Sequence, residues 1–239
     1  MENMRLDKFL SNTTGESRSR IKEILKAGRV KVNSETAKDP SLKIFPDTDS
    51  VELDSKAVVY EKFRYYMLNK PAGCVSATKD KLSETVLDFF RGENMDGFFP
   101  VGRLDKDSEG LLLITNDGML AHNLLSPSGH VEKVYFVELD RKLEEDDRIK
   151  IENEIDIGDD KPCLPAKVET KENNTALISI TEGRFHQVKR MFAAAGYEVK
   201  YLKRIAMGSL FLDEKLKPGE YRKLSDEDIC PLRKKEQYG

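Results

Sequence analysis

Cysteine and histidine are scarce in this chain of 239 residues. The three cysteines, Cys74, Cys163 and Cys230, are widely spaced and form no CxxC pair. An odd number of isolated cysteines predicts neither a disulfide framework nor a zinc site, and reduced thiols are typical of a cytoplasmic protein. The three histidines are equally scattered, and no Gly-rich phosphate loop is present. The sequence therefore predicts no metal and no cofactor.

Long apolar runs are also lacking. The longest are a few residues, whereas a helix that spans a bilayer needs about 20. The chain also lacks a charged start followed by an apolar segment, the pattern of a signal peptide. We therefore expect a cytoplasmic protein without membrane contact.

Charge is unevenly distributed, although the net value is only −3 and the pI is about 5.8. Residues 1–32 carry eight cations against four acids, and residues 182–204 carry six against two. Residues 138–172 hold thirteen acids against seven cations. Two basic regions can form a phosphate-binding face on an acidic protein, so a nucleic-acid partner is not excluded.

The first 60 residues predict a helix-loop-helix on a small sheet. Apolar residues at helical spacing indicate a first helix over residues 4–10, and Ser17 or Ser19 is a suitable N-cap for a second helix. Gly28 is suited to the left-handed C-cap, and residues 30–33 alternate as a strand. The polar face of the second helix, continued beyond its end, carries Arg18, Arg20, Lys22, Lys26 and Arg29. A merely solvated face would explain these cations, but the lack of regular Glu-to-Lys pairing favours phosphate contact.

Residues 61–239 predict an α+β domain with a mixed, largely antiparallel sheet, because many strands alternate irregularly with few helices. The alternating segment 133–139 places Tyr135 on one face together with Lys133, where ordinary packing is one explanation for the ring. Helices are expected over residues 83–90, 119–125, 143–151 and 185–195, and after Ser225. In the helix 185–195, Phe185 begins an apolar stripe.

A carboxylate, Asp105, lies between two apolar runs in the stretch 102–118, on a turn that also carries Arg103. Alternation along a strand would direct both side chains to the same side. Residues 105–112 fit the start of a calcium-binding EF-hand loop, but Asn116 stands where the twelfth position requires a bidentate Glu. A plain acidic hairpin is the other alternative.

The N-terminal segment resembles the small RNA-binding domain shared by a ribosomal protein of the small subunit and many RNA-modifying enzymes. The resemblance rests on residues 4–10, 17–18 and 28–33. It implies RNA binding through the basic residues of this domain, for which we select Arg5, Arg18, Arg20, Lys22 and Arg29. It implies no reaction.

Four further segments resemble the pseudouridine synthases, and most closely their RsuA group, which modifies small-subunit ribosomal RNA. They are the signature 102–118, the basic motif 183–192, and the shorter segments 69–73 and 132–135. With the N-terminal module, the resemblance covers nearly the whole chain. It implies an RNA-binding domain over residues 1–60 and a catalytic domain over residues 61–239.

The resemblance also assigns roles. Asp105 becomes the nucleophile, at C6 of the uracil or at C1′ of the ribose, and Tyr135 stacks on the flipped uracil and could take part in proton transfer. Lys189 pairs with Asp105 and stabilises its charge. Many relatives have Arg here, which can bind a carboxylate through two nitrogens, whereas Lys cannot. Arg103 fills the space that the base leaves. Further candidates for RNA contact are Arg184, His186, Gln187 and Lys70, although Arg184 could instead form a structural ion pair.

The sequence thus predicts a monomeric isomerase without cofactor or metal that converts one uridine of 16S ribosomal RNA, free or in an assembling particle, to pseudouridine by base flipping. Two alternatives remain. One is the same reaction on 23S RNA or tRNA. The other is a non-catalytic RNA-binding assembly factor.

Overall fold

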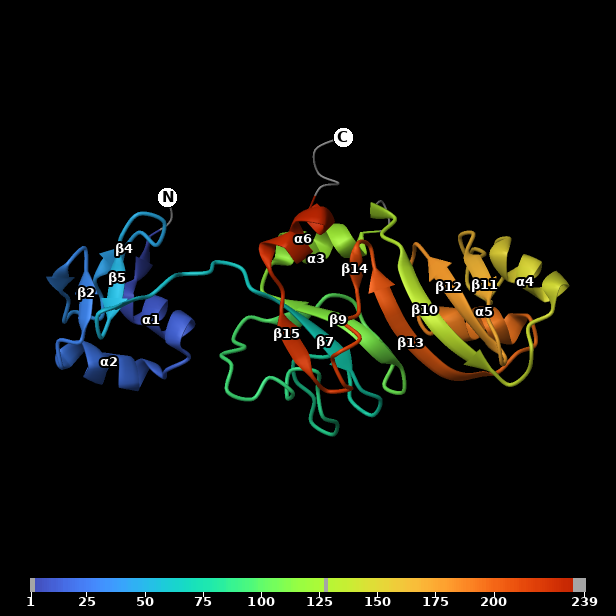
Figure 1. Cartoon of the computed structure of the whole chain (residues 1–239), viewed down its shortest axis with the longest axis horizontal. Coiled ribbons are helices and arrows are strands. Elements are labelled where there is room, and N and C mark those ends of the chain that lie inside the picture. Colours follow the sequence, from blue (N-terminus) through green and yellow to red (C-terminus); the bar gives the residue numbers. More distant parts are fainter. Residues whose placement is uncertain (1–2, 127–128, 234–239) are drawn as a thin grey trace. The chain divides into compact units, whose positions relative to one another are not determined.

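The computed structural model describes residues 3–126 and 129–233. The chain forms two compact units: one ends at Lys62 and also includes Arg91–Asp96, and the other comprises the rest of the chain from Phe63 onward. Figure 1 labels the elements of each unit.

The first unit is a helix pair with short strands. Its elements are β1 (Met4–Arg5), α1 (Leu6–Thr14), α2 (Arg18–Lys26), β2 (Val30–Val32), β3 (Glu35–Thr36), β4 (Lys43–Ile44), β5 (Val51–Leu53) and β6 (Lys56–Ala57). The Ser17 side chain caps α2 by accepting a hydrogen bond from the backbone N–H of Arg20, and Gly28 has a φ of 70°. The helix thus uses Ser17 of the two predicted N-caps, and Gly28 has the predicted left-handed conformation. The helices bury their apolar faces in one core, with Phe9 and Ile21 near its centre.

The second unit is built on a nine-stranded sheet with the strand order β11-β12-β10-β13-β9-β7-β15; β14 pairs with β13 and β8 with β9. Its strands are β7 (Tyr65–Lys70), β8 (Phe99–Pro100), β9 (Glu109–Thr115), β10 (Lys133–Leu139), β11 (Lys167–Thr170), β12 (Thr175–Ile180), β13 (Val199–Met207), β14 (Leu210–Phe211) and β15 (Tyr221–Lys223). Its helices are α3 (Gly118–Leu125), α4 (Glu145–Glu152), α5 (Gln187–Ala194) and α6 (Asp226–Arg233). Only the pairing of β9 with β13 is parallel among the described strand pairs of this sheet. The predicted α+β class with a largely antiparallel sheet is confirmed.

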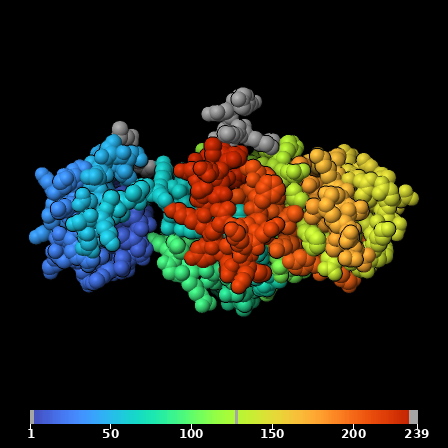
Figure 2. Space-filling model, in the orientation of Figure 1, coloured from blue at the N-terminus to red at the C-terminus, as the bar shows by residue number. Residues whose placement is uncertain are grey.

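Four of the five helices predicted for this unit are present, as α3, α4, α5 and α6. Figure 1 shows α3 and α6 together at the half that contains β7, β9 and β15, whereas α5 lies behind the other half. In the space-filling view (Figure 2), the orange and red end of the chain lies beside green segments from its middle. The helix predicted over residues 83–90 is wrong. Asp88 Oδ2 accepts hydrogen bonds from Thr85 N and Oγ1, which closes a turn there instead.

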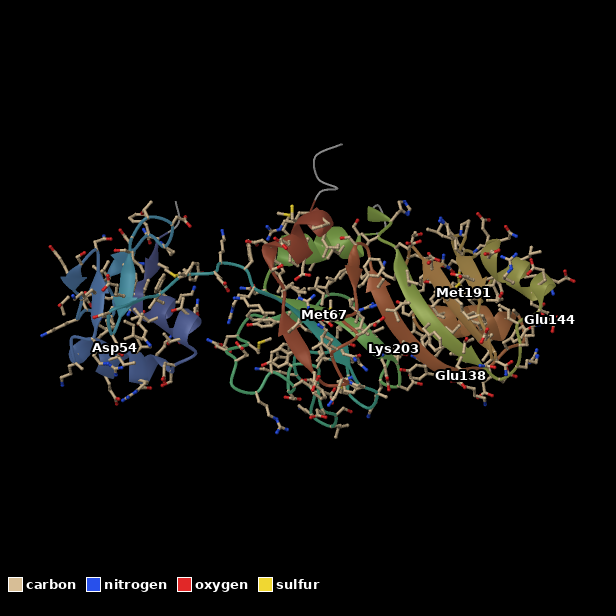
Figure 3. All side chains as sticks on the ribbon, in the orientation of Figure 1. Asp54, Met67, Glu138, Glu144, Met191 and Lys203 are labelled. Carbon is tan, nitrogen blue, oxygen red and sulfur yellow. The ribbon has the colours of Figure 1, made fainter. Side chains whose placement is uncertain are left out.

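The alternation predicted for β10 is confirmed. Lys133 and Tyr135 lie on its buried face, whereas Glu138 on the other face is exposed, as labelled in Figure 3. The pairing of β10 with β13 shifts register between Val134 and Tyr135. Such an irregularity changes the direction in which a strand presents its side chains.

Candidate active site

The loop between β8 and β9 carries Asp105 in a turn rather than in a strand, because residues 101–108 pair with no neighbouring strand in a ladder. Strand alternation therefore does not explain the placement of Arg103 and Asp105, contrary to the expectation. Both residues nevertheless line the same pocket. Arg103 is exposed, as an RNA-contacting side chain requires.

The buried side chain of Lys70 forms hydrogen bonds with the backbone of this loop. Its side chain is fully buried, and its Nζ donates to the backbone oxygens of Pro71 at 3.0 Å, Asp105 at 3.0 Å and Ser108 at 2.8 Å. Burial lowers the pKa of the ammonium. The expected direct contact of Lys70 with RNA is therefore wrong, since a side chain without exposed surface cannot reach a ligand. Lys70 instead fixes the backbone that positions Asp105.

Asp105 meets two side chains from the start of α5. His186 Nε2 lies 3.4 Å from one carboxylate oxygen and Lys189 Nζ lies 3.8 Å from the other. The closer partner of Lys189 is Asp107, at 2.5 Å, and that hydrogen bond lowers the pKa of Asp107. Segments more than 80 residues apart in the chain thus converge on one carboxylate. The ammonium serves two acids, of which the sequence suggested only Asp105.

A pocket of about 590 Å³ opens beside Asp105, between its loop, β10 and the segment before α5. Tyr135 lines it and is 8 % exposed, so the ring is mostly buried but borders the cavity. Lys133 and Arg204 also line it and are almost completely buried. Burial lowers the pKa of Lys133, and the nearby Arg204 guanidinium lowers it further. The pocket thus combines a carboxylate, a phenol ring and buried positive charge.

Two expected RNA contacts at the start of α5 and just before it, Gln187 and Arg184, form hydrogen bonds within the protein. Arg184 donates to the backbone oxygens of Lys161 and Pro162 and to Glu182. Gln187 is 4 % exposed and bonds to Glu182 through Nε2, while its Oε1 accepts from the backbone N–H of Arg184. For Arg184 the structure matches the alternative of a structural ion pair. The burial of Gln187 makes it a support of the loop rather than an exposed contact.

His186 and Phe185 are the exposed members of this segment. The helix begins at Gln187 rather than at Phe185, because His186 has a φ of 48° and ends the preceding turn. Phe185 is therefore not part of the buried stripe that the helical spacing predicted. Its ring is 69 % exposed, lines the pocket and stacks on the His186 ring at a centroid distance of 3.8 Å. Helical periodicity concealed this residue; the Gly183 that precedes it was the available signal of a loop.

The basic residues of the first unit differ in their partners. Arg5 and Arg29 bind carboxylates through two nitrogens each, Arg5 that of Asp7 and Arg29 that of Asp54, which Figure 3 labels. On α2, Arg20 pairs with Glu23 at 2.8 Å. Arg18 and Lys22 are exposed and form no salt bridge with any described residue. Of the five residues that the sequence suggested for RNA contact in this unit, Arg18 and Lys22 are thus the most available for phosphate groups.

The described part of the chain shows neither a metal-binding cluster nor a membrane helix. Within residues 3–126 and 129–233, no three His, Cys, Asp or Glu side chains are grouped so that they could hold a metal ion. No helix there is long and apolar enough to cross a membrane.

Comparison with known proteins identifies the family. A family model described as RNA pseudouridylate synthase matches residues 64–194, which are more than half of the chain, and a second model, the S4 domain, matches residues 4–47. The chain belongs to the RNA pseudouridine synthases. Asp105, Tyr135 and Lys189 all lie within the first match.

Individual relatives of this pseudouridine synthase extend over nearly its full length. The chain is 47 % identical over 231 residues to the uncharacterized RNA pseudouridine synthase YtzG of Bacillus subtilis, covering 95 % of this chain and 97 % of that protein. It is 39 % identical to the ribosomal small subunit pseudouridine synthase A of Haemophilus influenzae, covering 97 % and 100 %. A crystal structure described as pseudouridylate synthase aligns with a TM-score of 0.69 at 38 % identity, covering 96 % and 99 %. The predicted family, fold and enzyme class, and RNA as the substrate, are thereby confirmed.

Proposed function

We propose that this pseudouridine synthase modifies one uridine of small-subunit (16S) ribosomal RNA. The support for this target is the nearly full-length similarity to relatives named ribosomal small subunit pseudouridine synthase A, among them those of Haemophilus influenzae and Yersinia pestis. The S4 domain supplies a second RNA-binding surface, with Arg18 and Lys22 as its available cations. The enzyme acts as a monomer, and residues 1–60 and 61–239 act as its RNA-binding and catalytic domains.

Asp105 is the nucleophile in this proposal, and its place in the pocket carries the assignment. Its carboxylate is 25 % exposed, so it is accessible to a ligand, and His186 and Lys189 lie within 4 Å of it. A nearby cation stabilises an ionised carboxylate in a pocket from which the substrate excludes water. Attack at C6 of the uracil or at C1′ of the ribose is compatible with this arrangement.

Base flipping brings the uridine to Asp105, because the reacting atoms of a stacked base are out of reach. A cavity of about 590 Å³ is large enough for a nucleotide, and Tyr135 offers a ring against the flipped uracil. Tyr135 also carries a hydroxyl that can take part in the proton transfer from C5. The exposed guanidinium of Arg103 at the same pocket replaces the base in its stack. The isomerisation breaks N1–C1′ and forms C5–C1′ without a change in redox state or composition.

Chemical mapping tests both the target and the nucleophile. Total RNA from cells that lack the gene is treated with a pseudouridine-specific carbodiimide, and reverse-transcription stops are compared with the wild type. We expect one stop in 16S RNA to disappear, to return with the wild-type gene and to remain absent with Asp105→Asn. The Lys106→Gln variant, changed at an exposed neighbour on the same loop, serves as the control and restores the stop.

Each contrary outcome refutes a different part of the proposal. Identical stop patterns with and without the gene would support a non-catalytic assembly factor. A stop lost from 23S RNA or tRNA would refute the small-subunit target. Restoration of the stop by Asp105→Asn would refute Asp105 as the nucleophile.

A further inference from the structure

Three large exposed apolar side chains line the active-site pocket, and we call them the apolar rim: Leu125, Leu164 and Phe185. They come from three segments: the end of α3, the loop before β11 and the loop before α5. Single exposed apolar residues need no explanation, but a group around one opening marks a binding surface.

Phe185 is the most exposed member of this rim and its only aromatic one, at 69 % exposure. Burying such a ring contributes about 1.5–3 kcal/mol, so leaving it in water forgoes a stabilisation that packing would supply. Its ring stacks on that of His186, with the planes 18° apart. A stack of two rings leaves the outer face of each ring available to a further flat partner.

The loop that carries Phe185 is held in place by hydrogen bonds to its neighbours. Arg184 ties it to the backbone of Lys161 and Pro162, and Gln187 ties it to Glu182. The loop backbone that carries the ring is therefore held before a ligand binds, which lowers the cost of ordering it on binding. A rigid exposed aromatic ring is a common platform for unstacked RNA bases.

We propose that Phe185 stacks on a nucleobase next to the target uridine once that uridine has left its stack. This rests on the proposed function, since it requires a flipped uridine at Asp105. A flipped uridine deprives its neighbours of a stacking partner, and the rim lies where the RNA on either side of the pocket would pass. Arg103 lines the same pocket, where its guanidinium takes the place that the uridine leaves, so Phe185 serves a neighbouring base that this guanidinium does not cover. Phe185 thus contributes affinity for the sequence around the target rather than chemistry.

The test is a cycle of substitutions in enzyme and RNA. The substrate is the RNA that the mapping above identifies, ligated to full length with [5-³H]uridine at the target, so that isomerisation releases tritium from C5. Base–aromatic stacking contributes enough that Phe185→Ala should lower kcat/KM by about fivefold to 150-fold. The loss should appear in KM, because stacking is the same before and during reaction. Phe185→Tyr should retain most of the activity.

An abasic nucleotide identifies the stacked base. With the abasic site at the stacked position, wild type and Phe185→Ala should have equal kcat/KM, whereas at other positions they should differ by the full factor. Phe211→Ala is the matched control, since Phe211 is 70 % exposed on β14 and does not line the pocket. Its kcat/KM should equal that of the wild type.

Three results would overturn the stacking role. One is a Phe185→Ala enzyme within twofold of the wild type. Another is a loss confined to kcat, which would mean that Phe185 acts by positioning His186 against Asp105. The third is a Phe185→Ala effect that persists with an abasic site at every neighbouring position. A target outside 16S RNA refutes only the small-subunit assignment, because the same comparison is then made on that RNA.

Discussion

Replacement of Lys70 by methionine tests whether the active-site loop depends on one buried ammonium. Methionine has nearly the length of lysine but donates no hydrogen bond. The change would leave the backbone oxygens of Pro71, Asp105 and Ser108 without their donor in a site closed to water. Hydrogen bonds to charged groups contribute about 1.5–3 kcal/mol each, and part of the cost of burying the ammonium is recovered on its removal. We expect a net loss of about 3–5 kcal/mol in the free energy of unfolding.

Urea denaturation measures this loss directly, provided that the slope of the free energy of unfolding against urea concentration is the same in the variant and the wild type. The same variant should lose kcat at temperatures where it remains folded, because the backbone that positions Asp105 is released. Lys106→Met is the control on the same loop, since Lys106 is exposed and its Nζ donates to Ser83 Oγ in an exposed hydrogen bond, at 3.1 Å. It should change the free energy of unfolding by less than about 1 kcal/mol.

A Lys70→Met enzyme with an unchanged urea midpoint and a weakened affinity for RNA would refute this reasoning. Such a result would restore the contact with RNA that the sequence suggested for Lys70. It would also require the ammonium to leave its carbonyl partners when RNA binds.

Two further predictions concern stability. Hydrogen bonds from Arg222 lower the pKa of Asp228 to about 2, below its unfolded value, so this stabilisation is present above about pH 4 and is lost as the pH falls through 2. Asp228→Asn should therefore lose at most about 2 kcal/mol at pH 7 and much less at pH 2, where about half of the Asp228 carboxyl groups are protonated, in chemical denaturation; an equal gap at both pH values would contradict this. Gly110→Ala should lower the melting temperature sharply or prevent folding, because φ is 102° and a Cβ would lie 2.2 Å from the backbone oxygen of Arg204. Gly118→Ala, in open space at the start of α3, should leave the melting temperature unchanged or raise it.

Local signals in the sequence were sufficient for most elements. Capping residues and apolar periodicity located α2, α3 and α6, and Ser225 and Asp228 form the predicted reciprocal cap. Strand alternation assigned the correct face to Tyr135. These signals succeed because they depend on neighbours within one turn or one strand. The helix over residues 83–90 is absent because the backbone closes turns there, with hydrogen bonds from Asp88 N to Thr85 O and from Phe90 N to Leu87 O, in place of the i to i−4 bonds of an α-helix.

The sequence by itself determined the family, the mixed sheet and the small set of candidate residues, because long motifs and local patterns carry that information. Only the tertiary structure decided which of these side chains reach the pocket. In the folded chain Lys70 is buried beneath the loop of Asp105, Gln187 is buried, and Phe185 is exposed at the rim. The physical reason is that exposure and pairing depend on contacts between segments far apart in the chain, such as β7 with the β8–β9 loop. A carboxylate between two strands becomes a candidate nucleophile only when α5 brings Lys189 and His186 beside it.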